Sequence, residues 1–491
     1  MGVADRASRS SSYPADGSRR AVAILRGVSG NLSSSRWPWL LAAVLVVVVY
    51  LASLLRPADP RPSGTLADIE RLAERRDLNV LFVLIDTLRA DRLGAWGYHR
   101  DTSPMLDWLG AGGVRFGRHL SQSSWTKCSM ASLWTGLYPH RSRILRFDQV
   151  LPEAATLPAE ILQEAGFRTV GLYRNGWVAP NFGFDQGFEI YHQPLRLPLD
   201  PSVRRENPSL AGQSADDSAI EAARAFFHSS AGERWFLYVH LMDVHQYTYD
   251  EESALFGTSY SDVYDNSIRR EDRMVEMLIG HLTDAGMLQK TLIVISADHG
   301  EAFGERGFEG HARNVYQEVT EVPFILAFPF RLASGLVIDT RTENVDVWPT
   351  LLDLLGLPAL EEADGQSLVP LIRAAAEGRP LPSDESNAYA ELDQNWGRNG
   401  KEPAPTVAVA FGDFRYVLTT RDGREELFDG RSDAVETKNV IGEHAEVAER
   451  LRTAAGAYLA SPPPPWGDAA GTVELNEMEL NQLRALGYAI P

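Results

Sequence analysis

The 491-residue sequence contains a single cysteine, Cys128, and no internal repeat. One thiol excludes an intrachain disulfide, so the fold depends on its apolar core, with or without bound metal. Acidic residues outnumber basic ones after the N-terminal tail. The first 36 residues carry six arginines and two aspartates, a net charge of +4, which leaves −23 on the rest of a chain that totals −19. This acidity argues against nucleic acid as a partner, and an anionic substrate would need a cation in the site.

One long apolar run lies near the N-terminus. The uncharged stretch from Trp37 to Leu55 would span about 28 Å as a helix, close to the hydrocarbon thickness of a bilayer. The arginine-rich tail before it predicts a cytoplasmic N-terminus, with the rest of the chain outside, in the periplasm or the extracellular space. A cleaved signal peptide is the alternative. The basic region and the apolar run are both too long for one, and no small-x-small cleavage site follows. We therefore expect a single-pass membrane anchor.

Composition divides the chain into five parts. Residues 1–36 form the basic tail, 37–55 the expected membrane helix and 56–78 a proline-containing linker with a lead-in helix. Residues 79–370 are expected to form a catalytic domain. Residues 371–491 are expected to form a small C-terminal α+β subdomain.

Apolar runs of strand length alternate with helical patterns through the catalytic domain. Such runs are typical of strands buried on both faces of a parallel sheet. The alternation predicts an α/β fold with a doubly wound, mostly parallel sheet flanked by helices. The predicted strands are 79–85, 235–241, 291–296, 322–328, 407–411 and 415–420, and the predicted helices include 158–165, 267–285 and 445–459.

Acidic and imidazole side chains follow two of these strands directly. Asp86 follows the first, and Asp298 and His299 follow the strand at 291–296. Ligands of open α/β sheets bind beyond the carboxyl ends of the strands, and this set of side chains suits zinc, manganese or magnesium. A helix N-cap is an equally simple explanation for Asp86 alone, although capping explains Asp-His-Gly less well.

Three blocks of the sequence can be compared with known families by their order and spacing: 83–91, which contains Asp86, 125–132, which contains Thr126, and 291–304, which contains Asp298-His299. Together they resemble the sulfatase family of the alkaline-phosphatase superfamily, and 125–132 resembles the nucleophile segment of that family. With later features, the resemblance covers roughly residues 79 to 490. It implies an alkaline-phosphatase-like fold and an ester hydrolase with one or two divalent cations, zinc, manganese, magnesium or calcium.

The nucleophile segment departs from the family pattern. Sulfatases resemble one another in a Cys or Ser followed by x-Pro-Ser-Arg, the signal for conversion to formylglycine. Alignment on Thr135 places Thr126 at the nucleophile position, Cys128 at the proline and Met130 at the arginine, so formylglycine cannot form in the usual way. A divalent cation would stabilise the alkoxide of Thr126 and make it a direct nucleophile. The alternatives are a helix N-cap for Thr126 and, for Cys128, a small semi-buried residue without reactivity.

Other candidate residues lie near these blocks. The segment 240–245 resembles the family segment that carries a substrate-binding or second-metal histidine, and we take His245 as that histidine. Asp243 and His311 are candidates for a second metal site, although their spacing is shorter than in two-metal relatives. Lys127 is placed to neutralise charge on the transferred group, unless it is simply a solvated lysine.

Several functions fit this sequence. Threonine-bearing members of the superfamily are phosphodiesterases, phosphonate hydrolases and phospho-group transferases. The resemblance therefore favours phosphate or phosphonate esters, cleaved by double displacement through Thr126. The alternatives are a sulfuric ester hydrolase, a transferase of phospho groups to a surface glycan or lipid, and a membrane-tethered binding protein that has lost catalysis. The sequence leaves the oligomeric state open.

Overall fold

The structure is a computed structural model, and it describes residues 37, 39–45, 59–194, 215–396, 401–467, 471–475 and 477–485. The chain divides into two compact units, Met1–Pro60 and Arg61–Pro491. In the first unit, Trp37 and residues 39–45 are helical, and the rest of the expected membrane helix lies outside the described residues. Within the described ranges, no helix has both the length and the apolar character needed to cross a bilayer.

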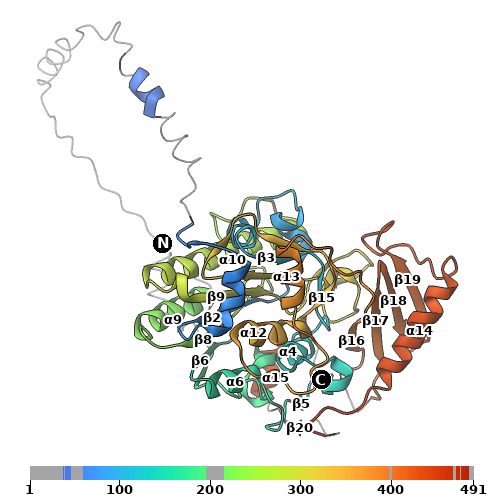
Figure 1. Ribbon diagram of the computed structural model, residues 1–491. Helices are drawn as coiled ribbons and strands as arrows, with labels where there is room; N and C mark the ends of the chain where they lie inside the picture. The colour runs from blue at the N-terminus through green and yellow to red at the C-terminus, as the bar shows by residue number, and fades with distance from the viewer. Residues whose placement is uncertain are drawn as a thin grey trace, which may run out of the picture. The chain divides into compact units, whose positions relative to one another are not determined.

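An eight-stranded sheet forms the centre of the second unit (Figure 1). Three of its strands match predicted strands residue for residue, at 79–85, 235–241 and 291–296, because each is a continuous apolar run buried on both faces. The strands lie in the order β14 (Leu336–Ile338), β3 (Val114–Phe116), β12 (Phe324–Ala327), β9 (Thr291–Ser296), β2 (Asn79–Ile85), β8 (Trp235–Leu241), β6 (Arg168–Leu172) and β7 (Ile190–His192).

The predicted strand at 322–328 runs against the others, which corrects the expectation that it belongs to the parallel part of the sheet. It forms β12, which pairs antiparallel with both β9 and β3, while the remaining pairs are parallel. Phe324, at the start of β12, pairs with Ser296, at the end of β9. The chain between them contains one helix, the four-residue α11 (Gln317–Thr320), and it re-enters the sheet at the same end of the strands at which it left. A parallel strand would need a full crossover connection to the opposite end of the strands.

Helices cover both faces of the sheet (Figure 1). Alternate side chains of β2 join two different clusters: Phe82 stacks on Trp134 and Trp348, whereas Val83 packs with the other set of helices. The first face carries α2 (Leu66–Glu70), α4 (Thr126–Thr135), α6 (Pro158–Glu164), α12 (Val347–Leu355) and α13 (Val369–Ala376), and the second carries α3 (Pro104–Ala111), α9 (Ala215–Ser229) and α10 (Tyr260–Asp284).

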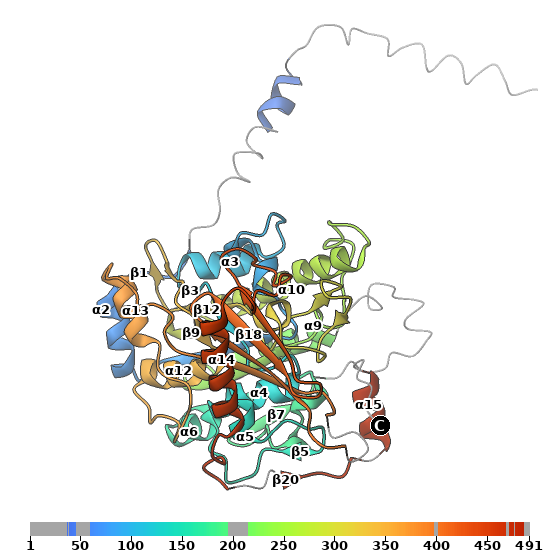
Figure 2. The same ribbon diagram turned by 90° about the vertical axis from the view of Figure 1, so that its right-hand side faces the viewer.

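The last part of the unit contains a second, antiparallel sheet. Its strands are β16 (Ala388–Asp393), β17 (Pro405–Phe411), β18 (Phe414–Thr419) and β19 (Arg424–Asp429). Helix α14 (Ala445–Leu459) lies across this sheet, with Leu451 and Ala455 packed on Val407 and Val409 (Figure 2). We call residues 388–459 the C-terminal lobe. The lobe is α+β and belongs to the same compact unit as the central sheet.

Short elements connect these layers. The loop between β9 and β12 contains the hairpin β10 (Ala302–Phe303) and β11 (Glu309–Gly310) and therefore stays at the carboxyl edge of the sheet. The others are β1 (Ser63–Gly64) with β13 (Arg331–Leu332), β4 (His119–Leu120) with β15 (Thr342–Glu343), β5 (Gln149–Val150) with β20 (Gly471–Thr472), α5 (Pro139–Ser142) and α15 (Glu477–Ala485).

Candidate metal centre and substrate cleft

Two parallel neighbouring strands deliver the metal-ligand candidates to one point. Asp86 directly follows β2, and Asp298 and His299 follow β9, its parallel partner. The carboxyl ends of parallel strands meet at the same edge of a sheet. One ligand atom from each of these three buried side chains lies within 4.8 Å of the other two. No helix begins at Asp86, because Thr87 has a φ of +63° and the next helical turn starts at Ala90, so the N-cap alternative for Asp86 is wrong.

The free lone pairs of this cluster converge. His299 donates from Nδ1 to the carbonyl oxygen of Gly300, 3.0 Å away, so Nε2 keeps its lone pair. Asp298 accepts from the backbone N–H of Thr87 and of His299 at Oδ1, while Oδ2 has no hydrogen-bond partner among the described residues. Asp86 Oδ1 also lacks one. Buried carboxylate oxygens are rarely left without a partner. Two such oxygens beside an imidazole lone pair fit a divalent cation.

Asp86 is oriented through its other oxygen. Oδ2 accepts from Nδ2 of Asn175, at 2.7 Å, and from Nε2 of His240, at 3.0 Å. Tyr238 donates to Nδ1 of His240 in turn, at 2.9 Å, which fixes the tautomer of that ring. Partners of this kind hold metal ligands in position. Asn175 was absent from the sequence-derived candidates, although it follows β6, another parallel strand of the same sheet.

Thr126 lies beside the metal-ligand cluster. It is the first residue of α4, and the N-cap position belongs to Trp125, so the hydroxyl of Thr126 does not cap the helix. Its Oγ1 lies 3.2 Å from His299 Nε2 and 3.2 Å from Asn175 Nδ2. The partial positive charge of the helix N-terminus favours negative charge at this oxygen.

Burial and neighbouring charges shift the pKa values of Asp86 and Asp298 in opposite directions. Burial alone would raise the pKa of Asp86, but the charges of His245, His240 and His299, with the hydrogen bond from His240, hold that pKa below its usual range. The pKa of Asp298 is raised, first by burial and then by the negative charge of Asp86. A cation between the two carboxylates would remove the repulsion between them.

Two further histidines lie next to this cluster. The ring of His311 lies 4.6 Å from that of His299 and 4.9 Å from that of His245, measured between centroids. His311 Nδ1 is 3.2 Å from Glu301 Oε2, and this carboxylate outweighs the effect of burial and raises the pKa of His311. Burial lowers the pKa of His245 to about 4. Both imidazoles line the cleft that lies next to the metal-ligand cluster.

Asp243 lies in a different group from His311. Its Oδ2 accepts from Arg270 Nε at 3.0 Å, and it forms a second buried acidic group with Asp216 and Glu271. The structure therefore does not bring Asp243 and His311 together as ligands of one metal.

Lys127 and Cys128 face the protein interior. Lys127 donates from Nζ to the carbonyl oxygen of Phe147, at 2.8 Å, and lies over the ring of Phe182. Burial lowers the pKa of Lys127 well below its usual value, so this lysine is not the solvated cation of the alternative interpretation. Cys128 is also buried, more deeply than predicted, and burial raises the pKa of its thiol.

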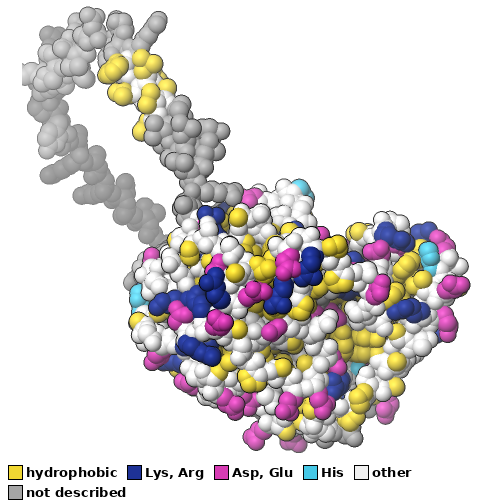
Figure 3. Space-filling view, viewed as in Figure 1, with side chains coloured by type: hydrophobic (Ala, Val, Ile, Leu, Met, Phe, Trp, Pro, Cys, Tyr) yellow, Lys and Arg dark blue, Asp and Glu magenta, His cyan; other side chains and the backbone are white. Residues whose placement is uncertain are grey.

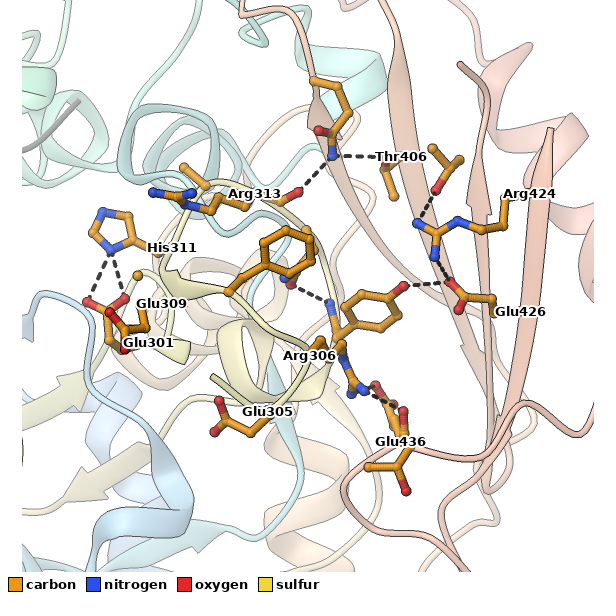
Figure 4. Close-up of a pocket in the computed structure, with 18 of the residues that line it drawn as sticks. Glu301, Glu305, Arg306, Glu309, His311, Arg313, Thr406, Arg424, Glu426 and Glu436 are labelled. Carbon is orange, nitrogen blue, oxygen red and sulfur yellow. Dashed lines mark hydrogen bonds and ion pairs between the residues drawn. The ribbon is translucent and has the colours of Figure 1, made fainter. Parts of the chain in front are cut away.

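A cleft of about 1270 Å³ opens over the two histidines. Figure 4 shows the loop with His311 and Arg313 on one side, and the strands with Thr406, Arg424 and Glu426 on the other. The second wall belongs to the C-terminal lobe, and the outline of the molecule is notched where the lobe meets the body (Figure 3). The lining combines acidic, basic and aromatic side chains, which suits a polar substrate larger than the reacting ester group.

Comparisons with known proteins agree with this architecture. The model of the family described as Sulfatase matches residues 78–357, more than half of the chain, and this protein belongs to the sulfatase family. A second model, described as the C-terminal part of N-sulphoglucosamine sulphohydrolase, matches residues 304–455. The chain is therefore an ester hydrolase of the sulfatase superfamily, with a cluster of residues that can bind a divalent metal.

Individual relatives include enzymes for both sulfuric and phosphonic esters. An ulvan-active sulfatase of Formosa agariphila is 24% identical over 420 residues, 76% of this chain and 79% of the relative. A choline-sulfatase of Rhizobium meliloti is 35% identical over 194 residues, 36% of this chain and 35% of the relative. The phosphonate monoester hydrolase of Agrobacterium radiobacter shares the fold, with a TM-score of 0.63 at 19% identity, covering 78% of this chain and 95% of that one.

Proposed function

We propose that the protein cleaves phosphate or phosphonate esters with Thr126 as a direct nucleophile. The observation that supports this most strongly is the position of Oγ1, 3.2 Å from His299 Nε2, a nitrogen that lies 3.9 Å from Asp86 Oδ1 and 3.3 Å from Asp298 Oδ2. Asp86, Asp298 and His299 would hold a divalent cation. Such a cation supplies electrostatic stabilisation of the nucleophile and of the oxygens of the transferred group.

The reaction would proceed in two displacements. In the first, Thr126 Oγ1 gives up its proton to solvent and attacks phosphorus as the alkoxide, the bond from phosphorus to the ester oxygen breaks, and the alcohol leaves with a proton. His245 and His311 both border the cleft beside the cluster, and His311, whose pKa is raised, is the group placed to donate that proton. In the second displacement, water attacks the threonine ester, the bond from phosphorus to Oγ1 breaks, and phosphate or phosphonate is released.

The nucleophile segment favours phosphoryl over sulfuryl transfer. The resemblance to formylglycine enzymes fails at Cys128 and Met130, so the hydrated aldehyde that those enzymes use is not available to this chain. Hydrolysis of sulfuric esters is the second candidate. It is supported by the sulfatase activity named for the ulvan-active relative, which covers three quarters of the chain.

The first experiment compares aryl phosphates, phosphonates and sulfates on metal-loaded protein, with mass spectrometry of the Thr126 peptide. We expect higher kcat/KM for a phosphorus ester and a phosphorylated or phosphonylated Thr126. Thr126→Ala should lower kcat by roughly 10⁴-fold or more while the protein still binds metal. Thr135→Ala, the same substitution at the other end of α4, should keep activity. Turnover by Thr126→Ala at the wild-type rate would contradict the proposal.

The other outcomes separate the remaining functions. Sulfate turnover with a sulfated Thr126 would identify a sulfuric ester hydrolase. Consumption of the covalent intermediate only in the presence of an added alcohol or glycan would identify a transferase. Metal binding without turnover of any ester would identify a binding protein.

We also propose that Trp37–Leu55 anchors the enzyme in a membrane with the catalytic unit outside. The support is the uncharged run, the arginines before it and the exposed apolar side chains of Trp37 and residues 39–41. The full chain should sediment with membranes and resist extraction by salt or alkali, and protease added to intact cells or spheroplasts should cleave the catalytic unit. Release of the full chain by alkali would refute an integral anchor.

A further inference from the structure

Asn175 occupies a central position between the nucleophile and a metal-ligand candidate. It lies three residues after β6 and is completely buried. Its Nδ2 donates to Asp86 Oδ2 at 2.7 Å and to Thr126 Oγ1 at 3.2 Å. An amide NH₂ group has two N–H bonds, so each of these acceptors takes one.

The orientation of this amide is fixed by its own oxygen. Oδ1 of Asn175 accepts from the backbone N–H of Trp177, at 2.9 Å, at the start of the short helical turn Gly176–Val178. Because a backbone N–H can only donate, the oxygen must face Trp177 and the nitrogen must face Asp86 and Thr126.

The loop that carries Asn175 is tied to the core through the residue before it. The preceding residue, Arg174, lies 3.2 Å from Asp216 Oδ1 and donates to the carbonyl oxygen of Pro194. Asp216 Oδ2 in turn accepts from the backbone N–H groups of Met242 and Asp243, after β8. The position of the amide is therefore set by the sheet and not by a free loop.

We propose that Asn175 is a catalytic residue with two effects, a role that rests on Thr126 being the nucleophile. By occupying Asp86 Oδ2 together with His240, it leaves Oδ1 as the oxygen that faces the metal position. By donating to Thr126 Oγ1, it stabilises negative charge on that oxygen when it attacks and again when it leaves. Hydrogen bonds to charged oxygens are about twice as strong as those to neutral ones, so this bond strengthens as charge develops.

This role has particular weight in this chain. The residue at the position of the family's arginine is Met130, and Nζ of Lys127 donates to the carbonyl oxygen of Phe147. Neither side chain supplies a cation to the nucleophile. A neutral amide that faces Oγ1 provides electrostatic stabilisation from a group whose own hydrogen bonds are satisfied.

The test uses Asn175→Ala and Asn175→Asp in the full-length enzyme. The aspartate variant keeps an oxygen for Trp177 and so preserves the turn, but it replaces both N–H donors. At saturating metal, we expect kcat to fall by about 100-fold in each variant, with KM within about threefold, because the amide contacts the nucleophile and not the leaving group. The dissociation constant of the metal, measured by calorimetry with Mn²⁺ or Zn²⁺ alone, should rise by about 10-fold or more.

Asn266→Ala is the matched control. Asn266 is equally buried, accepts from the backbone N–H groups of Leu255 and Phe256, and forms no bond to Asp86 or Thr126. It should lower the melting temperature by a similar amount and leave kcat and metal affinity unchanged.

Two results would overturn the role of Asn175. One is a kcat within threefold of wild type for either Asn175 variant at saturating metal, and the other is an equal loss of kcat in Asn266→Ala. If Thr126→Ala abolishes turnover while the Asn175 variants retain it, the nucleophile assignment stands and only the role of Asn175 fails. Retention of activity by Thr126→Ala would instead remove the proposed function itself.

Discussion

Replacing Asp298 by asparagine should stabilise the metal-free protein and destabilise it relative to wild type once metal is added. Asp86 and Asp298 are both buried, with ligand oxygens no more than 4.8 Å apart. At an effective dielectric constant of about 20, two negative charges at that distance repel by roughly 3.5 kcal/mol. The amide keeps an oxygen for the N–H groups of Thr87 and His299, and its nitrogen can donate toward Asp86 Oδ1, which has no hydrogen-bond partner among the described residues.

With metal bound, the order of the two melting temperatures should reverse, so that wild type melts above Asp298→Asn. A ligand present at 1,000 times its dissociation constant stabilises the folded state by about 4 kcal/mol, and most of that gain requires both carboxylates. In chelator, Asp298→Asn should therefore melt above wild type, with a difference of about 2 to 3 kcal/mol once the repulsion is offset by partial protonation. In saturating Mn²⁺ or Zn²⁺ it should melt below wild type.

Calorimetric melting of both proteins, in chelator and in each metal, measures this reversal. The control is Asp272→Asn, because Asp272 is equally buried and accepts from the backbone N–H groups of Met105 and Leu106, outside the cluster. The effect of that substitution should be the same with and without metal. A wild-type protein that melts higher than Asp298→Asn in chelator, or an identical response of the two to metal, would refute a cation site between these carboxylates.

Three further outcomes follow from the buried groups. Lys127→Met should change kcat/KM less than about threefold, since the amine bonds to the carbonyl of Phe147 and not to the reacting group; a loss above 100-fold in steady-state assays would restore a role in charge neutralisation. Cys128 should resist thiol reagents in the folded protein and react fully in denaturant, because it is buried and its pKa is raised; rapid labelling under native conditions would contradict this. Burial, followed by the charge of Asp346, raises the pKa of Glu343 to about 8, so the folded state binds a proton more tightly than the unfolded state and loses stability as pH rises from about 4.5 to 8. Glu343→Gln should remove this part of the difference in unfolding free energy between pH 5 and pH 8, measured by urea unfolding. An unchanged difference would contradict the prediction.

Much of the fold could be predicted because burial on both faces leaves a clear pattern. The runs at 79–85, 235–241 and 291–296 are continuous apolar stretches, and each forms a strand with those bounds. Strand direction could not be predicted in the same way, because an apolar run reads alike in a parallel and an antiparallel strand, and β12 was misplaced for that reason. The helix predicted at 267–285 in fact begins at Tyr260. Its start was predicted too late because serine, aspartate and asparagine are frequent in its first two turns. The capping box between Ser259 and Asp262 was the signal available for the true start.

The candidate site shows the same limit. Asp86, Asp298 and His299 follow long apolar strands and were found by that rule, and the structure places them together with Thr126. Asn175 was missed because its strand, Arg168–Leu172, has five residues and includes arginine, threonine and glycine. Asp243 was included because of its neighbours in sequence, but its carboxylate pairs with Arg270.

The two walls of the cleft come from distant parts of the chain. Residues near His311 form one wall, and strands β17 to β19 of the C-terminal lobe, roughly a hundred residues later, form the other. An ion pair from Arg306 in the loop to Glu436 in the lobe joins the two parts across this distance. Mutations in the lobe can therefore change which ester leaving groups fit the cleft without changing the metal-ligand cluster or Thr126. Exchange of lobes between relatives offers a direct route to new substrate selectivity.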